Sequence, residues 1–327
     1  MWARLAKIII LICGNSNKMK NLFEPFIIQK GIVILDGAMA TELETRGADL
    51  NHALWSAKLL KEDPLLIQQV HYDYLIAGAD VITTASYQAS FEGFAKHGYT
   101  KKQATELMQL SVQLAFNARE AALKILPQLI KPLVAASVGP YGASLADGSE
   151  YRGNYGISIE DLKTFHRSRL KILIETGADI LACETIPCID EAIALKELLT
   201  EFPGVQAWIS FSCKDETHIS SGEDFADAVK LLNDSDQIVA VGVNCTSPQY
   251  IASLVQIAAS VTDKLIIVYP NKGEIWNAAN KRWISASLQP THFCDDAKKW
   301  HAAGAKIIGG CCRTTPEDIQ QLKQLAV

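Results

Sequence analysis

The 327-residue sequence has no apolar run of the roughly 18 residues that a membrane-spanning helix needs. It also has no excess of positive charge, because 31 Lys and Arg stand against 36 Asp and Glu and give a formal net charge of -5. This balance argues against nucleic acid and anionic membranes as partners. No Gly-x-Gly-x-x-Gly phrase follows the first expected strand, which weighs against a dinucleotide-binding fold.

The first 22 residues differ from the rest of the chain. Residues 8–13 form a short apolar run after Arg4 and Lys7, as in a secretory signal peptide. The run is short, however, and residues 14–17 lack a convincing small-residue cleavage site. We therefore expect residues 1–22 to form a poorly ordered extension, and residues 23–327 to form the functional domain.

Cysteine is well represented, but not in the manner of a small secreted disulfide scaffold. Reduced thiols in a cytoplasmic enzyme are the better interpretation, with metal binding or catalysis as the role of some of them. The eight cysteines are Cys13, Cys183, Cys188, Cys213, Cys245, Cys294, Cys311 and Cys312.

Short runs of branched apolar residues alternate with longer amphipathic segments along the domain. Parallel strands that are covered on both faces have continuous Val, Ile, Leu and Ala sequences of this kind. Eight such runs lie at residues 32–35, 80–84, 133–138, 179–183, 206–210, 239–244, 265–269 and 306–308.

The segments between these runs have the caps of helices. Asp63-Pro64, Ser158, Ser247-Pro248 and Thr315-Pro316 supply capping side chains or a proline in the first turn. Eight strand–helix units in strict alternation predict a single (β/α)8 TIM-type barrel. The expected helices lie at residues 64–77, 101–126, 159–175, 190–199, 225–232, 248–260, 293–303 and 316–325.

The carboxyl ends of barrel strands meet in one mouth, where catalytic residues gather. The sixth and eighth strands end in Cys245 and in the Cys311-Cys312 pair, and the first and fourth end in Asp36 and Glu184. Long loops at residues 139–156 and 271–289 follow the third and seventh strands, and loops of this length are usually functional.

Cys245, Cys311 and Cys312 come from strands that are separated by only one other strand, so they can meet around one ion. Three thiolates leave one tetrahedral position open, which is typical of a catalytic zinc site, and soft sulfur ligands favour Zn2+ over Mg2+ or Ca2+. The alternative is that these cysteines are small buried apolar residues. We assign that role to the cysteines at 183, 188, 213 and 294.

Three motifs resemble the homocysteine S-methyltransferase family. They are Asp-Gly-Ala-Met-Ala-Thr-Glu-Leu at residues 36–43, Gly-Val-Asn-Cys at 242–245 and Gly-Gly-Cys-Cys at 309–312. The similarity runs from about Ile32 to the C-terminus. It implies that the three matching cysteines bind zinc, that zinc binds the sulfur of homocysteine, and that Asp36 and Glu184 contact the ammonium group of the substrate.

Thr185, Tyr87 and Trp55 are further candidates for substrate contacts, with packing as the alternative for each. For Asp36 the alternative is a cap of the first loop, and for Glu184 it is an ion pair with Arg152.

The methyl donor is less strongly indicated than the acceptor. Aromatic residues on the mouth loops suit a sulfonium cation, so we expect S-methylmethionine first and S-adenosylmethionine second. Betaine is third, because the long C-terminal arm of the tetrameric betaine enzymes is missing, and this absence also indicates a monomer. Two alternatives stay open. One is another acceptor such as selenohomocysteine, and the other is a non-catalytic zinc-stabilised barrel whose fourth ligand is Cys213.

Overall fold

The computed structural model describes residues 20–50, 56–127, 130–277, 282–285 and 293–326. Eight parallel strands form one sheet in the order β1-β10-β7-β6-β5-β4-β3-β2, and a parallel bridge between Leu35 and Val81 joins its two edges. The predicted (β/α)8 barrel is therefore confirmed. The strands are β1 (Val33–Ile34), β2 (Val81–Thr83), β3 (Leu133–Val138), β4 (Ile180–Ile186), β5 (Ala207–Phe211), β6 (Ile238–Asn244), β7 (Leu265–Tyr269) and β10 (Ile307–Ile308).

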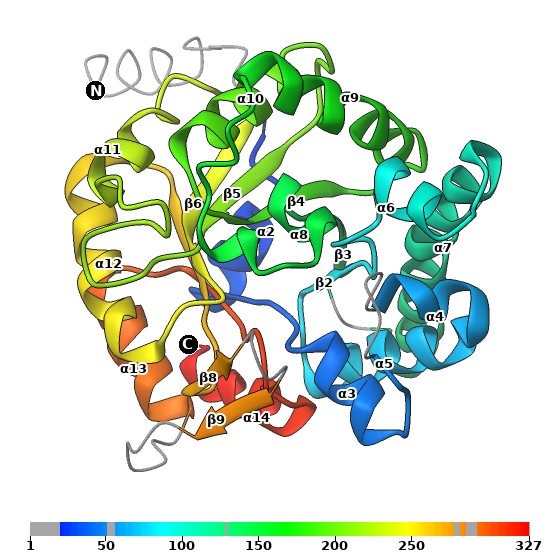
Figure 1. The fold of residues 1–327 in the computed structure, drawn as a ribbon. Coiled ribbons are helices and arrows are strands. Elements are labelled where there is room, and N and C mark those ends of the chain that lie inside the picture. The colour runs from blue at the N-terminus through cyan, green and yellow to red at the C-terminus, as the bar shows by residue number, and fades with distance from the viewer. Residues whose placement is uncertain (1–19, 51–55, 128–129, 278–281, 286–292, 327) are drawn as a thin grey trace, which may run out of the picture.

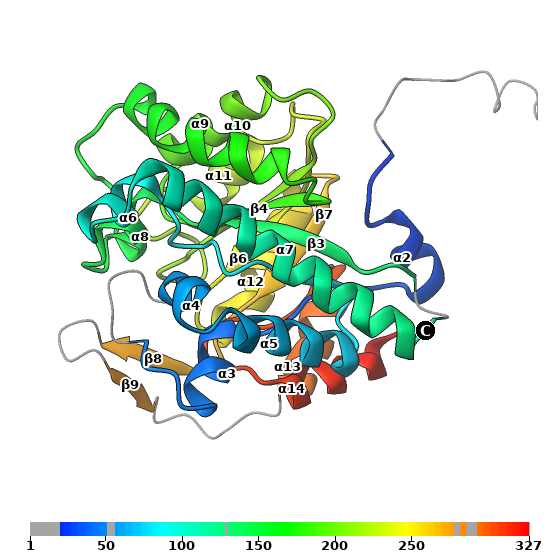
Figure 2. The same ribbon diagram turned by 90° about the vertical axis from the view of Figure 1, so that its right-hand side faces the viewer.

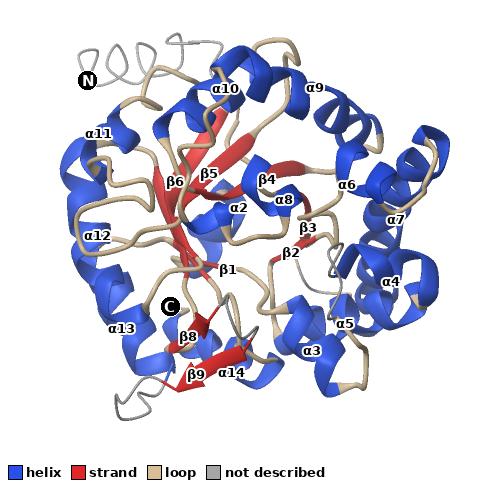
Figure 3. Ribbon diagram, in the orientation of Figure 1, coloured by secondary structure: helices blue, strands red, loops and turns tan. Residues whose placement is uncertain are grey.

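Helices surround the strands on the outside of the barrel, as Figures 1 and 3 show. The predicted bounds of α5, α9 and α13 coincide with the observed ones. Gly78, Gly177 and Gly304 have φ angles of 116°, 79° and 127° and turn the chain back toward the next strand. The predicted helices are α5 (Pro64–Ala77), α7 (Lys101–Ile125), α9 (Ile159–Glu175), α10 (Ile189–Leu199), α11 (Phe225–Lys230), α12 (Pro248–Val261), α13 (Phe293–Ala303) and α14 (Pro316–Gln321), which continues as η2 (Leu322–Leu325).

Several elements were not predicted from the sequence. The loop expected at residues 139–156 contains α8 (Tyr141–Leu145) and η1 (Ser149–Tyr151), and the loop expected at 271–289 contains an antiparallel hairpin of β8 (Glu274–Asn277) and β9 (Arg282–Ser285). These pieces are too short to show a clear hydrophobic period. The other additions are α2 (Glu24–Lys30), α3 (Met39–Thr45), α4 (Ser56–Glu62) and α6 (Phe91–Lys96).

The amino-terminal segment of the domain covers one end of the barrel. Phe23 and Phe26 are buried within the barrel core, and the Phe23 ring centroid lies 6.2 Å from that of Trp208. The Gln206 side chain accepts a hydrogen bond from the amide of Leu22 at 3.1 Å. Figure 2 shows α2 at this end and α8 with the β8–β9 hairpin at the opposite end. The mouth formed by the carboxyl ends of the strands is therefore the end left for a site.

Residues 1–19 of the expected extension lie outside the described residues. Within the described ranges, no helix combines the length and the apolar character that crossing a membrane requires.

The close approach of β6 and β7 depends on Gly242. A Cβ atom at this position would lie 1.8 Å from the carbonyl oxygen of Ile267, so any other residue would force the two strands apart. This contact holds the end of β6, which carries Cys245, against the end of β7.

His71 on α5 makes the stability of the barrel depend on pH. The side chain is fully buried, and neither ring nitrogen has a hydrogen-bond partner among the residues that the structure describes. Burial lowers the pKa of His71 from 6.5 to about 3, so the folded chain keeps the imidazole neutral. The unfolded chain binds an additional proton at His71 below pH 6.5, and the folded chain does not. The folded state is therefore fully stable with respect to this group above pH 6.5 and loses stability as the pH falls from 6.5 toward the folded pKa of about 3.

We expect the free energy of unfolding to decrease by about 1.4 kcal/mol for each pH unit below 6.5 through this residue alone. Urea unfolding at about pH 7 and about pH 5.5 measures the slope. A His71→Leu variant should lose this contribution, and a slope equal to that of the parent chain would contradict the assignment.

Candidate functional site

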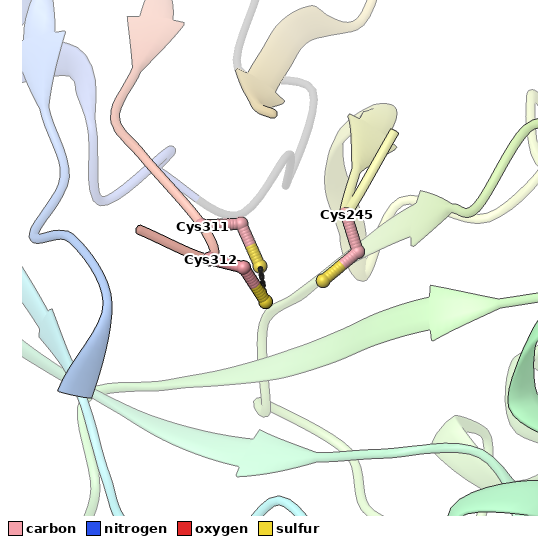
Figure 4. A group of neighbouring side chains, drawn as sticks. All are labelled: Cys245, Cys311 and Cys312. Atoms are coloured by element: carbon pink, nitrogen blue, oxygen red, sulfur yellow. Dashed lines mark hydrogen bonds between the residues drawn. The ribbon is translucent and has the colours of Figure 1, made fainter. Parts of the chain in front are cut away.

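The structure brings Cys245, Cys311 and Cys312 together at the mouth of the barrel. Their sulfur atoms all lie within 4.8 Å of one another, and those of Cys311 and Cys312 are 4.0 Å apart. Figure 4 shows the three thiols pointing toward one another. A tetrahedral zinc ion with Zn–S bonds of about 2.3 Å separates its sulfur ligands by about 3.8 Å. The group therefore fits one such ion after a small contraction.

The backbone explains why these thiols converge. As predicted, only β7 separates β6 from β10. The end of β7 accepts hydrogen bonds from both of these neighbours. The amide of Cys245 donates to the Tyr269 carbonyl at 3.2 Å, and the amide of Cys311 donates to the Pro270 carbonyl at 2.8 Å. Cys245 itself has a φ of 48°, a left-handed conformation that is rare for cysteine. Strain of this kind is concentrated at functional positions.

The glycines before the cysteine pair permit a close approach of β10 to its neighbours. A Cβ atom on Gly309 would lie 2.5 Å from the Cβ atom of Leu35, and one on Gly310 would lie 2.3 Å from Thr314 Oγ1. Larger residues would therefore displace the turn that presents both thiols to the mouth.

The three thiols differ in pKa. Hydrogen bonds from Cys311 and Cys312 lower the pKa of Cys245 well below its ordinary value, and the same contacts raise the pKa of Cys311 and Cys312. Cys245 therefore has the lowest pKa of the three thiols. A soft divalent cation would take the place of the thiol protons.

Asp36 and Glu184 place two buried carboxyl groups at the same mouth, and Glu184 is close enough to Cys245 for the charge of that thiol to raise its pKa. The Thr83 amide donates to Asp36 Oδ2 at 2.7 Å, and the Ser137 hydroxyl makes a short hydrogen bond to Glu184. Burial raises the pKa of Asp36 to about 8, with the Glu184 charge adding to the rise, and burial raises the pKa of Glu184 to about 7.

The alternative roles of these two acids were a cap of the first loop for Asp36 and an ion pair with Arg152 for Glu184. Arg152 does not pair with Glu184, because its Nη2 atom lies 3.6 Å from Asp147 and 2.8 Å from Ser149 Oγ. Asp36 does bind the end of β2 through Thr83, so it also has a structural role. Neither acid forms an ion pair within the described part of the chain. Two buried carboxylates in this situation form a suitable environment for a ligand cation.

Thr185 is held beside the thiols by Asn244, whose importance the sequence analysis did not identify. Thr185 has a φ of 61°, and its amide donates to Asn244 Oδ1 at 2.7 Å while Asn244 Nδ2 donates to its hydroxyl at 2.8 Å. The Thr185 side chain is also hydrogen-bonded to Cys245 and to Tyr87, and these bonds lower the pKa of both groups. The position of Asn244 next to Cys245 at the end of a strand was the available signal.

Tyr87 lies against the loop that follows β3. The buried guanidinium of Arg169 donates to the carbonyl oxygens of Tyr87 and Gly139 at 3.2 and 3.1 Å. Burial raises the pKa of Tyr87 well above its ordinary value, and the charges of Glu150 and Cys245 add to the rise. Of the predicted contact residues, Trp55 lies outside the described residues.

The four cysteines assigned to packing lie apart from this group. Cys183, Cys188, Cys213 and Cys294 are buried, and none of them joins the three-sulfur group among the described residues. Burial raises the pKa of Cys183 and Cys188 to about 12, which keeps both thiols protonated.

Comparison with known proteins identifies the family. A family model described as homocysteine S-methyltransferase matches residues 33–326. Homocysteine S-methyltransferase YbgG of Bacillus subtilis is 53% identical over 294 residues, covering 89% of this chain and 93% of its own, and homocysteine S-methyltransferase of Escherichia coli is 48% identical over 310 residues, covering 95% and 99%. The metallated crystal form of the homocysteine methyltransferase MmuM from Escherichia coli matches with a TM-score of 0.85 and 47% identity, over 93% of this chain and 99% of that one. The chain belongs to the homocysteine S-methyltransferase family, a family of methyltransferase enzymes.

Proposed function

We propose that the chain transfers a methyl group from a sulfonium donor, S-methylmethionine in the first place, to the thiol of homocysteine and so produces methionine. The observation that carries the proposal is the group of three sulfur atoms within 4.8 Å of one another at the mouth of the barrel. The family membership and the names of the relatives support the acceptor.

We assign a zinc ion to Cys245, Cys311 and Cys312. The all-sulfur ligand set supports this choice of metal, and the metallated form of the Escherichia coli relative supports the presence of a metal at all. When bound, zinc would act as a Lewis acid that promotes deprotonation of an alkyl thiol and keeps its sulfur nucleophilic at neutral pH.

Asp36 and Glu184 bind the ammonium group of homocysteine in this account. Their carboxylates are buried, close enough to interact, and fixed by Thr83 and Ser137. A bound ammonium would stabilise both charged forms and would direct the thiol of the same molecule toward the cysteines. This orientation lets the sulfur approach the donor methyl in line.

The reaction exchanges one carbon–sulfur bond for another. The homocysteine sulfur supplies the electron pair of the new S–C bond, its proton leaves to solvent, and the donor sulfur keeps the pair of the broken bond. The aromatic side chains of Tyr87 and Tyr151 near Cys245 support a cationic donor. S-adenosylmethionine is the second candidate and betaine the third.

An assay of methionine formation tests the proposal. Homocysteine is offered with S-methylmethionine, S-adenosylmethionine or betaine in turn, before and after treatment with a zinc chelator. We expect turnover with a sulfonium donor and its loss after chelation, with recovery when zinc is restored. Turnover that survives complete removal of metal would contradict the zinc assignment, and turnover with betaine alone would contradict the choice of donor.

The remaining alternatives have their own arms in the same assay. Selenohomocysteine as acceptor measures how far the enzyme accepts another nucleophile. A non-catalytic barrel would need a fourth protein ligand, and Cys213, the candidate named for that role, lies outside the three-sulfur group.

A further inference from the structure

Glu150 is an acidic residue at the mouth that the sequence analysis did not select. It lies in η1, within the loop that follows β3. Its Oε2 atom is buried and has no hydrogen-bond partner among the described residues. A buried carboxylate oxygen without a donor is costly, since the charged form loses its hydration without compensation. The position therefore needs an explanation beyond the folding of the loop.

The groups that act on Glu150 include acidic side chains of its own loop and of the metal site. Burial raises the pKa of Glu150 to about 7, and the charges of Asp147 and Cys245 add to the rise. The charge of Glu150 in turn raises the pKa of Tyr87. The guanidinium of Arg152 also acts on Glu150, but it points to Asp147 and Ser149, and its side chain is 65% exposed. No ion pair to Glu150 is present within the described part of the chain.

The backbone holds Glu150 in place independently of its side chain. A Cβ atom on Gly142 would lie 2.5 Å from the Glu150 amide nitrogen, so α8 packs directly against η1. The Ser212 hydroxyl donates to the Glu150 carbonyl at 3.4 Å, and Glu191 accepts from the Tyr141 amide and the Tyr155 hydroxyl at 2.5 and 3.1 Å. The loop is thus fixed at several points, and the carboxylate does not serve as its anchor.

We propose that the Glu150 carboxylate is the counter-ion of the cationic sulfur of the methyl donor. This inference rests on the proposed function, and it gives the three acids different roles. Asp36 and Glu184 interact with each other and serve the ammonium of the acceptor, whereas Glu150 lies beside Tyr87 on a different loop. An anionic carboxylate and an aromatic ring together form the environment that a sulfonium prefers.

The charge of the donor changes during the reaction, which gives the proposal a specific kinetic signature. The sulfonium becomes a neutral thioether as the methyl group leaves, so the attraction to Glu150 is greatest for the bound donor and weaker in the transition state. Glu150 should therefore lower the KM for the donor without raising kcat. It should also favour the donor over the neutral product.

The test compares the parent enzyme with Glu150→Gln, which keeps the shape and removes the charge. We expect the KM for S-methylmethionine to rise about tenfold and kcat to change less than about twofold. The inhibition constant of methionine, measured against S-methylmethionine at saturating homocysteine, should stay unchanged, as should zinc content and the KM for homocysteine. Glu150→Asp should recover part of the donor affinity.

Glu216→Gln is the matched control, because it makes the same change at an exposed side chain of another mouth loop, the one that follows β5. An unchanged donor KM in Glu150→Gln would overturn the proposal, and so would an equal loss of affinity for methionine, which a structural role would produce. Calorimetric binding of S-methylmethionine to the zinc-loaded parent and variant separates the two proposals. Binding that depends on the Glu150 charge but leads to no turnover would contradict the proposed function and would support the role of Glu150.

Discussion

A Cys311→Ala enzyme is expected to lose bound zinc and homocysteine methylation together while the barrel stays folded. Cys311 is partly exposed at the mouth rather than packed in the core, so its loss should cost little stability. Two sulfur ligands cannot hold the metal firmly, and without it the homocysteine thiol stays largely protonated at neutral pH. We expect turnover to fall by about 1000-fold or more, with zinc content falling from about one per chain to nearly none.

Zinc content by elemental analysis and methionine formation by chromatography measure the two losses on the same sample. Cys213→Ala is the matched control, since that thiol is buried at the end of β5 but lies outside the three-sulfur group. It should keep zinc and activity. Full activity in a zinc-free Cys311→Ala sample would remove the cysteines from the mechanism.

A Glu184→Gln enzyme is expected to bind homocysteine about 30- to 100-fold more weakly and to keep its zinc, because a charge-assisted hydrogen bond is worth about 2–3 kcal/mol. The amide oxygen of Gln can still accept from Ser137, so the local structure should be retained. Initial rates with varied homocysteine at saturating donor give the KM.

An acceptor without the amino group provides the control for Glu184. The parent enzyme and Glu184→Gln should methylate 4-mercaptobutanoate with similar KM values, because that thiol has no ammonium to lose. An unchanged KM for homocysteine in the variant would exclude Glu184 from the ammonium site. A larger effect on 4-mercaptobutanoate than on homocysteine would point to a disturbed metal site instead.

The barrel could be predicted because its signals are local and repeated. The continuous apolar runs of β3 and β7 gave the bounds of both strands, and the proline and serine caps gave the starts of α5 and α9. The order of the strands then followed from the rules of the fold, and with it the meeting of Cys245 with the pair at 311–312.

The rest of the site depends on contacts that no local pattern contains. Glu150 carries no distinguishing neighbour in the sequence, and its burial at the mouth depends on the packing of η1 against Gly142 and on the bond from Ser212. Asn244 at the end of β6 bonds to Thr185 of β4 across the one strand between them, and Arg169 on α9 holds the carbonyl of Tyr87. The β8–β9 hairpin was missed because its strands are four residues each. The monomeric state stays a prediction.

The central claim is that three cysteine sulfurs bind one zinc ion and leave a position for the thiol of the substrate. X-ray absorption at the zinc K-edge, recorded on zinc-loaded enzyme with and without homocysteine, tests it most directly. We expect three sulfur atoms at about 2.3 Å before homocysteine is added and four afterwards. Four sulfur ligands in both samples, or three in both, would contradict the account.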